Sequence, residues 1–159
     1  DSEIALEVGK TQTVTAVVQP ADATEAGVIW ASSDEQVLSV TNGKVKALQG
    51  GTCTLYCLAS DGSGVRALCS VSVSEKIKSL QAAEKKHSLT VGDSWQPEII
   101  IKPDSATNRA LRWSSSDEAV CAVDEAGQVT AVGAGKCVLS CETTDGSKKT
   151  VKINVTVTE

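Results

Sequence analysis

The sequence contains no methionine and no phenylalanine, and its 159 residues include only three tryptophans and one tyrosine. Without methionine there is no initiator residue, and no basic-then-apolar leader segment is present. No apolar run approaches the roughly 18–20 residues that a bilayer span needs. We therefore expect a processed protein or a piece of a longer one, with no membrane insertion by this segment.

The sequence also has no concentrated patch of charge. Its net charge is −5, and its lysines and arginines are scattered along the chain. This distribution argues against nucleic acid and anionic membrane surfaces as partners. The apolar content of 41% comes mainly from Val, Ala, Leu and Ile. Because Val and Thr favour strands and helical spacing never persists, the composition predicts an all-β protein.

Histidine is nearly absent, which bears on catalysis. The one histidine, His87, lies in a lysine-rich stretch far from the serine–aspartate groups at 32–34 and 115–117. Ser and Asp commonly bond their own backbone in tight turns, so we interpret both groups as turn residues. The sequence predicts no catalytic residue, no bound cofactor and no enzyme activity.

Aspartates in predicted loops raise the question of calcium, because loop carboxylates can share a hard cation. No EF-hand spacing appears, and turn aspartates exposed to water explain the same pattern, so no metal site is predicted. The residues in question are Asp22, Asp34, Asp61, Asp104, Asp117 and Asp145.

A duplication dominates what the sequence does contain. Trp30-Ala-Ser-Ser-Asp34 matches Trp113-Ser-Ser-Ser-Asp117 at an offset of 83 residues. After one extra residue near Ala126 the offset is 84, and Gly51-x-Cys-x-Leu-x-Cys57 matches Gly135-x-Cys-x-Leu-x-Cys141. The order of the matches predicts two domains, at residues 1–75 and 76–159.

Each copy has the pattern of short strands separated by turn residues. Apolar and polar residues alternate, as a half-buried strand requires, and Asp61-Gly-Ser-Gly64 is a hairpin signal. Seven strands in about 75 residues predict an antiparallel sandwich of the immunoglobulin kind. In the first copy we expect strands at Ile4–Val8, Gln12–Gln19, Val28–Ser32, Val37–Thr41, Lys44–Leu48, Thr52–Ser60 and Val65–Ser74.

These residues resemble a known family. The ordered motifs Val-Gly, Pro-x-x-Ala-Thr, Trp-x-Ser-Ser-Asp-x-x-Val, Gly-x-Val-x-Ala, Gly-x-x-x-Leu and Asp-Gly are similar to the bacterial immunoglobulin-like domain, group 2, and they occur twice. The resemblance implies a β-sandwich without shared catalytic residues. It also implies that the module occurs in the kinds of protein that contain this family: bacterial surface adhesins, cell-wall proteins, exoenzymes and phage virion proteins.

The two copies differ at their starts. The second is preceded by the strand-like Ile77-Lys-Ser-Leu-Gln-Ala82, whereas the first begins almost at its Val-Gly. We interpret the first strand of copy one as truncated, as in a piece of a longer array. The linker Ser74-Glu-Lys-Ile-Lys78 has no Gly or Pro, which predicts a stiff, elongated rod.

The core of each copy is expected to form around a tryptophan between the two sheets. Trp95 has no counterpart in copy one, and both a surface contact and local packing remain open for it. The predicted core residues are Trp30, Trp113, Val37, Val120, Leu55 and Leu139.

Six cysteines leave several pairings open. Cys53 and Cys57 lie on one predicted strand about 13 Å apart, beyond the reach of a disulfide, and Cys137 and Cys141 repeat this spacing. If the hairpin loop is Gly62-Ser-Gly64, Cys57 lies opposite Cys69 and could bond to it. Cys121 could reach Cys137 or Cys141 across the sandwich. We favour buried, unpaired thiols at the matched positions.

The functional expectation is a non-catalytic module of a bacterial cell-surface or secreted protein, acting as a rod-like spacer or adhesion segment. Its location would be extracellular or on the bacterial surface. Its partners would be a protein or glycan ligand on a surface and the neighbouring domains of a longer chain. The alternatives are a phage virion decoration or tail module, or an accessory domain of a secreted carbohydrate-active enzyme.

Overall fold

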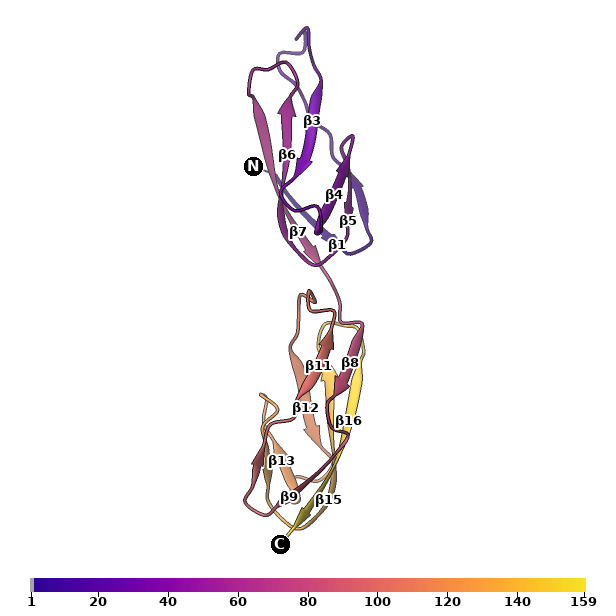
Figure 1. Cartoon of the computed structure of the whole chain (residues 1–159), viewed down its shortest axis with the longest axis vertical. Coiled ribbons are helices and arrows are strands. Elements are labelled where there is room, and N and C mark those ends of the chain that lie inside the picture. Colours follow the sequence, from indigo (N-terminus) through magenta and orange to yellow (C-terminus); the bar gives the residue numbers. More distant parts are fainter. Residues whose placement is uncertain (1) are drawn as a thin grey trace. The chain divides into compact units, whose positions relative to one another are not determined.

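The computed structural model describes residues 2–159 and divides the chain into two compact units, residues 1–75 and 76–159 (Figure 1). All regular elements within the described residues are strands. A helix that could cross a membrane is absent from residues 2–159. The all-β prediction is confirmed.

Two layers of strands build the first unit. One layer has the order β1-β7-β6-β3, and the other has the order β2-β5-β4. Their inward side chains form one core that includes Leu38, Val45 and Leu55. The strands are β1 (Ser2–Glu7), β2 (Thr11–Thr13), β3 (Val28–Ser32), β4 (Leu38–Thr41), β5 (Lys44–Ala47), β6 (Gly51–Ala59) and β7 (Arg66–Ser74).

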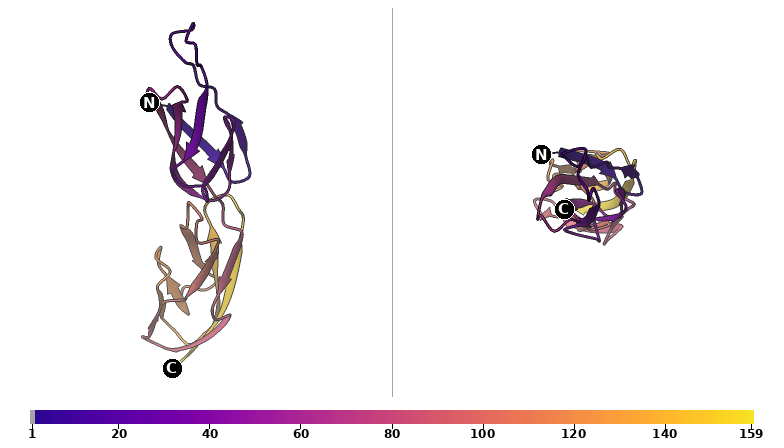
Figure 2. Two further views of the ribbon diagram at one scale, coloured as in Figure 1. Left: turned by 45° about the horizontal axis from the view of Figure 1, so that its top comes forward. Right: turned by 90° about the horizontal axis from the view of Figure 1, so that it is seen from above.

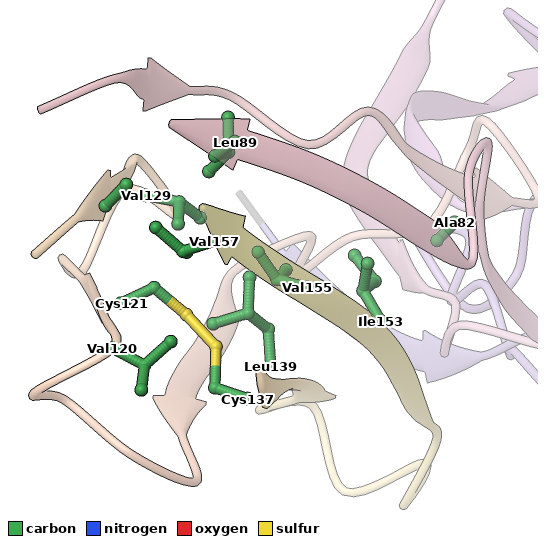
Figure 3. Close-up of a cluster of buried hydrophobic side chains, with 11 residues drawn as sticks. Ala82, Leu89, Val120, Cys121, Val129, Cys137, Leu139, Ile153, Val155 and Val157 are labelled. Carbon is green, nitrogen blue, oxygen red and sulfur yellow. A yellow bond between two sulfur atoms is a disulfide. The ribbon is translucent and has the colours of Figure 1, made fainter. Parts of the chain in front are cut away.

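The second unit repeats this plan and adds strands. The order β12-β15-β16-β9 forms one layer, and β10-β14-β13 forms a sheet that faces it across the core (Figure 3). A separate two-stranded sheet joins β8 to β11. The strands are β8 (Ser79–Ala82), β9 (Lys86–Thr90), β10 (Ser94–Trp95), β11 (Ile99–Lys102), β12 (Leu111–Ser115), β13 (Cys121–Val123), β14 (Val129–Ala131), β15 (Gly135–Thr143) and β16 (Thr150–Thr158).

Alternating burial along the long strands explains why these sequences form sheets. In β6 the side chains of Cys53, Leu55 and Cys57 are buried, while those of Thr52 and Leu58 on either side of this stretch are exposed. Because successive strand residues point to opposite faces, the odd-numbered residues fill the core. The even-numbered residues form the outer face of the sheet.

One strand pair in each unit departs from the antiparallel pattern. β1 pairs parallel with β7, and β9 pairs parallel with β16. Parallel neighbours need a long connection between them, and here the connection is the rest of the unit.

The tryptophan prediction is only partly met. Trp30 and Trp113 are half-buried and pack against the core clusters rather than lying fully inside them. The other predicted core residues, Val37, Val120, Leu55 and Leu139, are buried. Leucine, valine and cysteine side chains therefore fill the centre, and each indole covers its rim.

The recurring Gly-x-Val-x-Ala motif has a steric reason in the second unit. Gly127 has a φ of +84°, and a Cβ there would lie 2.5 Å from the Trp113 ring. Only glycine combines this backbone conformation with so close an approach. The glycine and tryptophan motifs therefore belong to one packing arrangement.

The predicted strand Gln12–Gln19 is wrong for most of its length. Only Thr11–Thr13 forms a strand, and the chain then runs as a long connection to β3 (Figure 2). The matching stretch of the second unit contains β10 and β11, and β11 pairs with β8. No strand within residues 2–75 matches β8, and residues 16–19 pair with none of the strands described there.

Candidate functional site

The serine–aspartate groups are turn elements in both units. The Oδ1 atom of Asp34 accepts a hydrogen bond from the Gln36 amide at 2.9 Å, and Asp117 Oδ1 accepts one from the Ala119 amide at 3.0 Å. These carboxylates therefore hold the loop that leads into the next strand, as aspartates in turns commonly do.

His87 is half-buried in the second unit. Its ring stacks on Trp95 with centroids 3.8 Å apart and planes 6° apart, and its Nδ1 lies 2.8 Å from a Glu84 carboxylate oxygen. Trp95 also packs against the core cluster. Of the two roles left open for Trp95, the structure supports local packing, with a histidine partner that sequence spacing did not reveal.

A metal site does not emerge from the described residues. Within residues 2–159 no three His, Cys, Asp or Glu side chains are arranged to hold an ion. The hairpin aspartates instead accept backbone hydrogen bonds, as Asp61 does from the Ser63 amide at 2.9 Å.

The structure forms one of the two bridges left open for Cys121, and it does not form the Cys57–Cys69 bridge that the sequence also left open. The preference for unpaired thiols at the matched positions is wrong for Cys137. Cys121 on β13 is bonded to Cys137 on β15 and joins the two layers of the second unit (Figure 3). Cys57 and Cys69 are free and buried. The correction comes from strand register: Cys57 lies opposite Ala67, and Cys69 lies opposite Leu55.

The remaining thiols have the character of core residues. Cys53, Cys57, Cys69 and Cys141 are buried and unpaired. Burial raises the pKa of each of these thiols, in the case of Cys141 to about 11. Since the thiolate is the reactive form, none of them has the character of a catalytic nucleophile.

The outer sheet faces offer the surfaces where a partner could bind. A shallow hollow of about 720 Å³ lies on the first unit, and one of about 570 Å³ lies on the second. The two hollows are lined by matching positions of the duplicated sequence. Glu3 and Thr52 of the first hollow correspond to Lys86 and Lys136 of the second, so the two faces differ in charge.

Next to the first hollow, the outer face of the first unit is apolar. Ile29 lies opposite Leu58, and Tyr56 lies opposite Leu68 and beside Ala31. Three of these side chains are exposed: Ile29 by 58%, Leu58 by 36% and Leu68 by 43%. We call the set Ile29, Ala31, Tyr56, Leu58 and Leu68 the apolar face.

The second unit is polar at every matching position. Arg112 lies opposite Glu142, with an Nη1–Oε1 distance of 3.2 Å. Ser140 lies opposite Lys152 and beside Ser114. One fold therefore carries two chemically different outer faces, so the fold does not require the apolar side chains of the first unit.

Sequence comparison identifies the class of protein that this fold defines. The profile of the family described as bacterial Ig-like domain (group 2) matches residues 1–68 and again residues 70–154. The chain therefore belongs to the bacterial Ig-like domain (group 2) family, as two tandem copies.

Curated relatives place such copies in several kinds of protein. The chain is 34% identical over 158 residues to an uncharacterised protein of Clostridium acetobutylicum, covering 99% of this chain and 16% of that protein. It is 30% identical over 155 residues to an Ig-like virion protein of Serratia phage KSP90, covering 94% of this chain and 60% of the relative.

A third relative is an enzyme, a 3-O-alpha-D-galactosyl-alpha-L-arabinofuranosidase of Bifidobacterium longum subsp. longum. It is 34% identical over 100 residues, which is 63% of this chain and 8% of the enzyme. In all three cases the chain spans less than two thirds of the relative's own length.

Proposed function

We propose that this chain is a non-catalytic binding and spacer module of a bacterial cell-surface or secreted protein. The first unit binds a protein partner through its apolar face, and the second unit serves as spacer. The observation that carries this proposal is the contrast between the exposed Ile29, Leu58 and Leu68 and their polar counterparts in the second unit.

The chemistry of the apolar face favours a protein over a glycan. Aliphatic side chains around one tyrosine resemble the centre of a protein–protein interface, where charged residues are depleted. Glu3 and Arg66 lie at its margins on the same sheet and supply a polar rim. Contiguous exposed apolar residues of this kind commonly mark interaction sites.

An extracellular location has independent support. The Cys121–Cys137 disulfide fits an oxidising compartment, because such bonds are rare where thiol reductants are abundant.

The spacer role is supported by the linker. Glu75 accepts a hydrogen bond from the Gly50 amide within the first unit, and the Ile77 amide donates one to Asp145 within the second. Only Lys76 lies between these anchored residues.

A triple substitution tests the apolar face. The variant Ile29→Arg, Leu58→Glu and Leu68→Lys installs the residues that the second unit already carries at these positions, so we expect the fold to be kept. We expect wild-type chain to bind at least one member of a panel of purified matrix and envelope proteins in biolayer interferometry. The variant should bind that protein at least about tenfold more weakly, since central apolar anchors dominate interface energies.

The matched control alters the second unit instead. Lys86→Glu and Lys136→Thr place the residues of the first hollow into the second. This control should bind as the wild type does. Equal binding of the triple variant and the wild type would contradict the proposal, as would loss of binding in the control alone.

A virion module is the second candidate, because the phage relative matches nearly the whole chain. In that setting the apolar face would contact another virion protein rather than a host or envelope protein. The genes that flank the coding sequence separate the two candidates. Virion structural genes would support the second, and a surface-anchored reading frame would support the first.

A further inference from the structure

The outer face of the second unit gathers three lysines that lie far apart in the sequence. Lys86 lies on β9, Lys136 on β15 and Lys152 on β16, and all three side chains are exposed. In the sheet order β12-β15-β16-β9, the strand β16 lies between the other two. Because the strand neighbours of these lysines point into the core, the three lysines share the opposite, outer face.

The pairing register sets the spacing of these lysines. Lys86 pairs with Asn154, and Lys136 pairs with Thr156. Lys86 and Lys136 are therefore two strands apart and two residues out of register, which places their Cα atoms roughly 10–12 Å apart. Lys152 is one strand from Lys86 and two residues out of register, so these Cα atoms are about 8 Å apart. Long, flexible lysine side chains can reach several anionic groups of one ligand across such spacings.

The charges of these lysines are not neutralised by the protein. None of the ion pairs within residues 2–159 includes Lys86, Lys136 or Lys152. The one carboxylate that β9, β12, β15 and β16 place on this outer face belongs to Glu142, and it is paired with Arg112. A surface of one sign therefore stands on a chain whose net charge is −5, and such a surface attracts anions.

The hollow of about 570 Å³ on this face is lined by two of the lysines, Lys86 and Lys136. Ser88, Asn154 and Thr156 also line it. Hydroxyl and amide side chains both donate and accept hydrogen bonds, which is the chemistry that sugar hydroxyls require. The hollow thus combines cations with neutral polar groups in one surface.

The strands beneath this hollow favour a glycan over a peptide or a nucleic acid. β15 and β16 are each paired on both sides, so their backbone groups are occupied and a peptide cannot add to them as a further strand. Among the described residues that line the hollow there is no Phe, Tyr or Trp. The hollow therefore lacks the stacking platforms that single-stranded nucleic acid sites use.

We infer that this hollow binds an anionic polysaccharide. Carboxylate or sulfate groups of the sugar chain pair with Lys86, Lys136 and Lys152, and its hydroxyls contact the polar side chains between them. One exposed ion pair contributes little, so a chain with repeated acidic groups binds better than a single anion. This site adds a ligand to the unit that the proposed function treats as a spacer, and it does not depend on the apolar face.

An NMR titration of the full 159-residue chain with a short oligogalacturonate tests the inference, with a sulfated dextran oligosaccharide as a second arm. We expect one oligosaccharide to bind per chain, with shift changes at the residues lining this hollow and not at the hollow of the first unit. Binding of either probe supports the inference, and the tighter one identifies the preferred acidic group. Galacturonate monomer and neutral dextran should each bind at least about tenfold more weakly.

Two double variants separate this site from general charge attraction. Lys86→Glu with Lys136→Thr should weaken oligosaccharide binding at least about tenfold. The same variant should keep protein binding by the apolar face, so the two proposals fail separately. Lys44→Glu with Lys46→Thr makes the same change in net charge at exposed positions of β5. This control should bind the oligosaccharide within about twofold of wild type.

The first unit allows the reciprocal experiment, because Glu3, Thr52 and Leu68 occupy the matching positions there. Replacing all three with lysine should let the chain bind a second oligosaccharide, and an unchanged stoichiometry would overturn the inference. Equal loss of binding in the two double variants would overturn it as well. So would an acidic peptide that binds the second hollow as tightly as the oligogalacturonate, or the absence of shift changes at that hollow with both acidic probes.

Discussion

Leu139→Ala is expected to lower the free energy of unfolding of the second unit by about 2–5 kcal/mol. Leu139 is 0% exposed and lies beside the disulfide and Val155 at the centre of the core (Figure 3). A domain of this size has only several kcal/mol of stability in total, so a large share of the unit should unfold without denaturant. Urea titration followed by NMR signals assigned to each unit measures the change.

Leu55→Ala is the matched control for this prediction. Leu55 is the counterpart of Leu139 and is 1% exposed in the core of the first unit. Each substitution should lower the urea midpoint of its own unit and leave the other midpoint nearly unchanged, because the two cores are separate clusters. A single cooperative transition that both variants shift equally would contradict the presence of two separate cores.

Reduction of Cys121–Cys137 is expected to destabilise the second unit by about 3 kcal/mol. The bond closes a loop between cysteines 16 residues apart, and loop-closure models assign about this value to a loop of that length. Urea titration with and without a phosphine reductant should therefore move the midpoint of the second unit. The first unit, whose cysteines are all free, should not respond.

The first unit also suggests the control for this experiment. Leu38 and Cys53 occupy the positions of Cys121 and Cys137 there. Cys121→Leu therefore reproduces a pair that the same fold accepts, and the stability of this variant should not respond to reductant.

A thiol titration checks the bridge separately. The unreduced, denatured wild-type chain should contain four reactive thiols. Six reactive thiols, or no response of the second unit to reductant, would contradict the bridge.

The sequence predicted a strand correctly where an alternating segment also had a neighbouring strand to pair with. Alternation along Cys53–Cys57 and the turn residues around Gly62 place β6 and β7 within one or two residues of their observed bounds. Residues 16–19 alternate in the same way and form no strand. Alternation reports which face of a segment is apolar, whereas a strand also needs a neighbour to pair with.

The sequence left the Cys121–Cys137 bridge open, but it could not predict which residue lies opposite Cys57, because alternation does not fix register. The predicted hairpin placed Cys57 opposite Cys69, and the observed one places it opposite Ala67. The bond from the Ala59 amide to the Val65 carbonyl gives a longer loop than expected. A shift of two residues keeps every side chain on its own face, so the burial pattern of both registers is the same.

The apolar face was missed although the sequence contained a signal for it. Leu55-Tyr-Cys-Leu-Ala59 is apolar without interruption, which means that both faces of that strand are apolar there. Its counterpart, Leu139-Ser-Cys-Glu-Thr143, keeps the alternation. Comparing the two copies position by position, rather than matching only their shared residues, would have revealed the difference.

Hydrogen exchange on the Leu139→Ala variant tests most directly the claim that the duplicated sequence folds as two units with separate cores. Amides in Gly135–Thr143 and Thr150–Thr158 should exchange at least about tenfold faster than in the wild type, while those in Gly51–Ala59 and Arg66–Ser74 should keep their rates. Equally faster exchange in both pairs of strands would contradict the account.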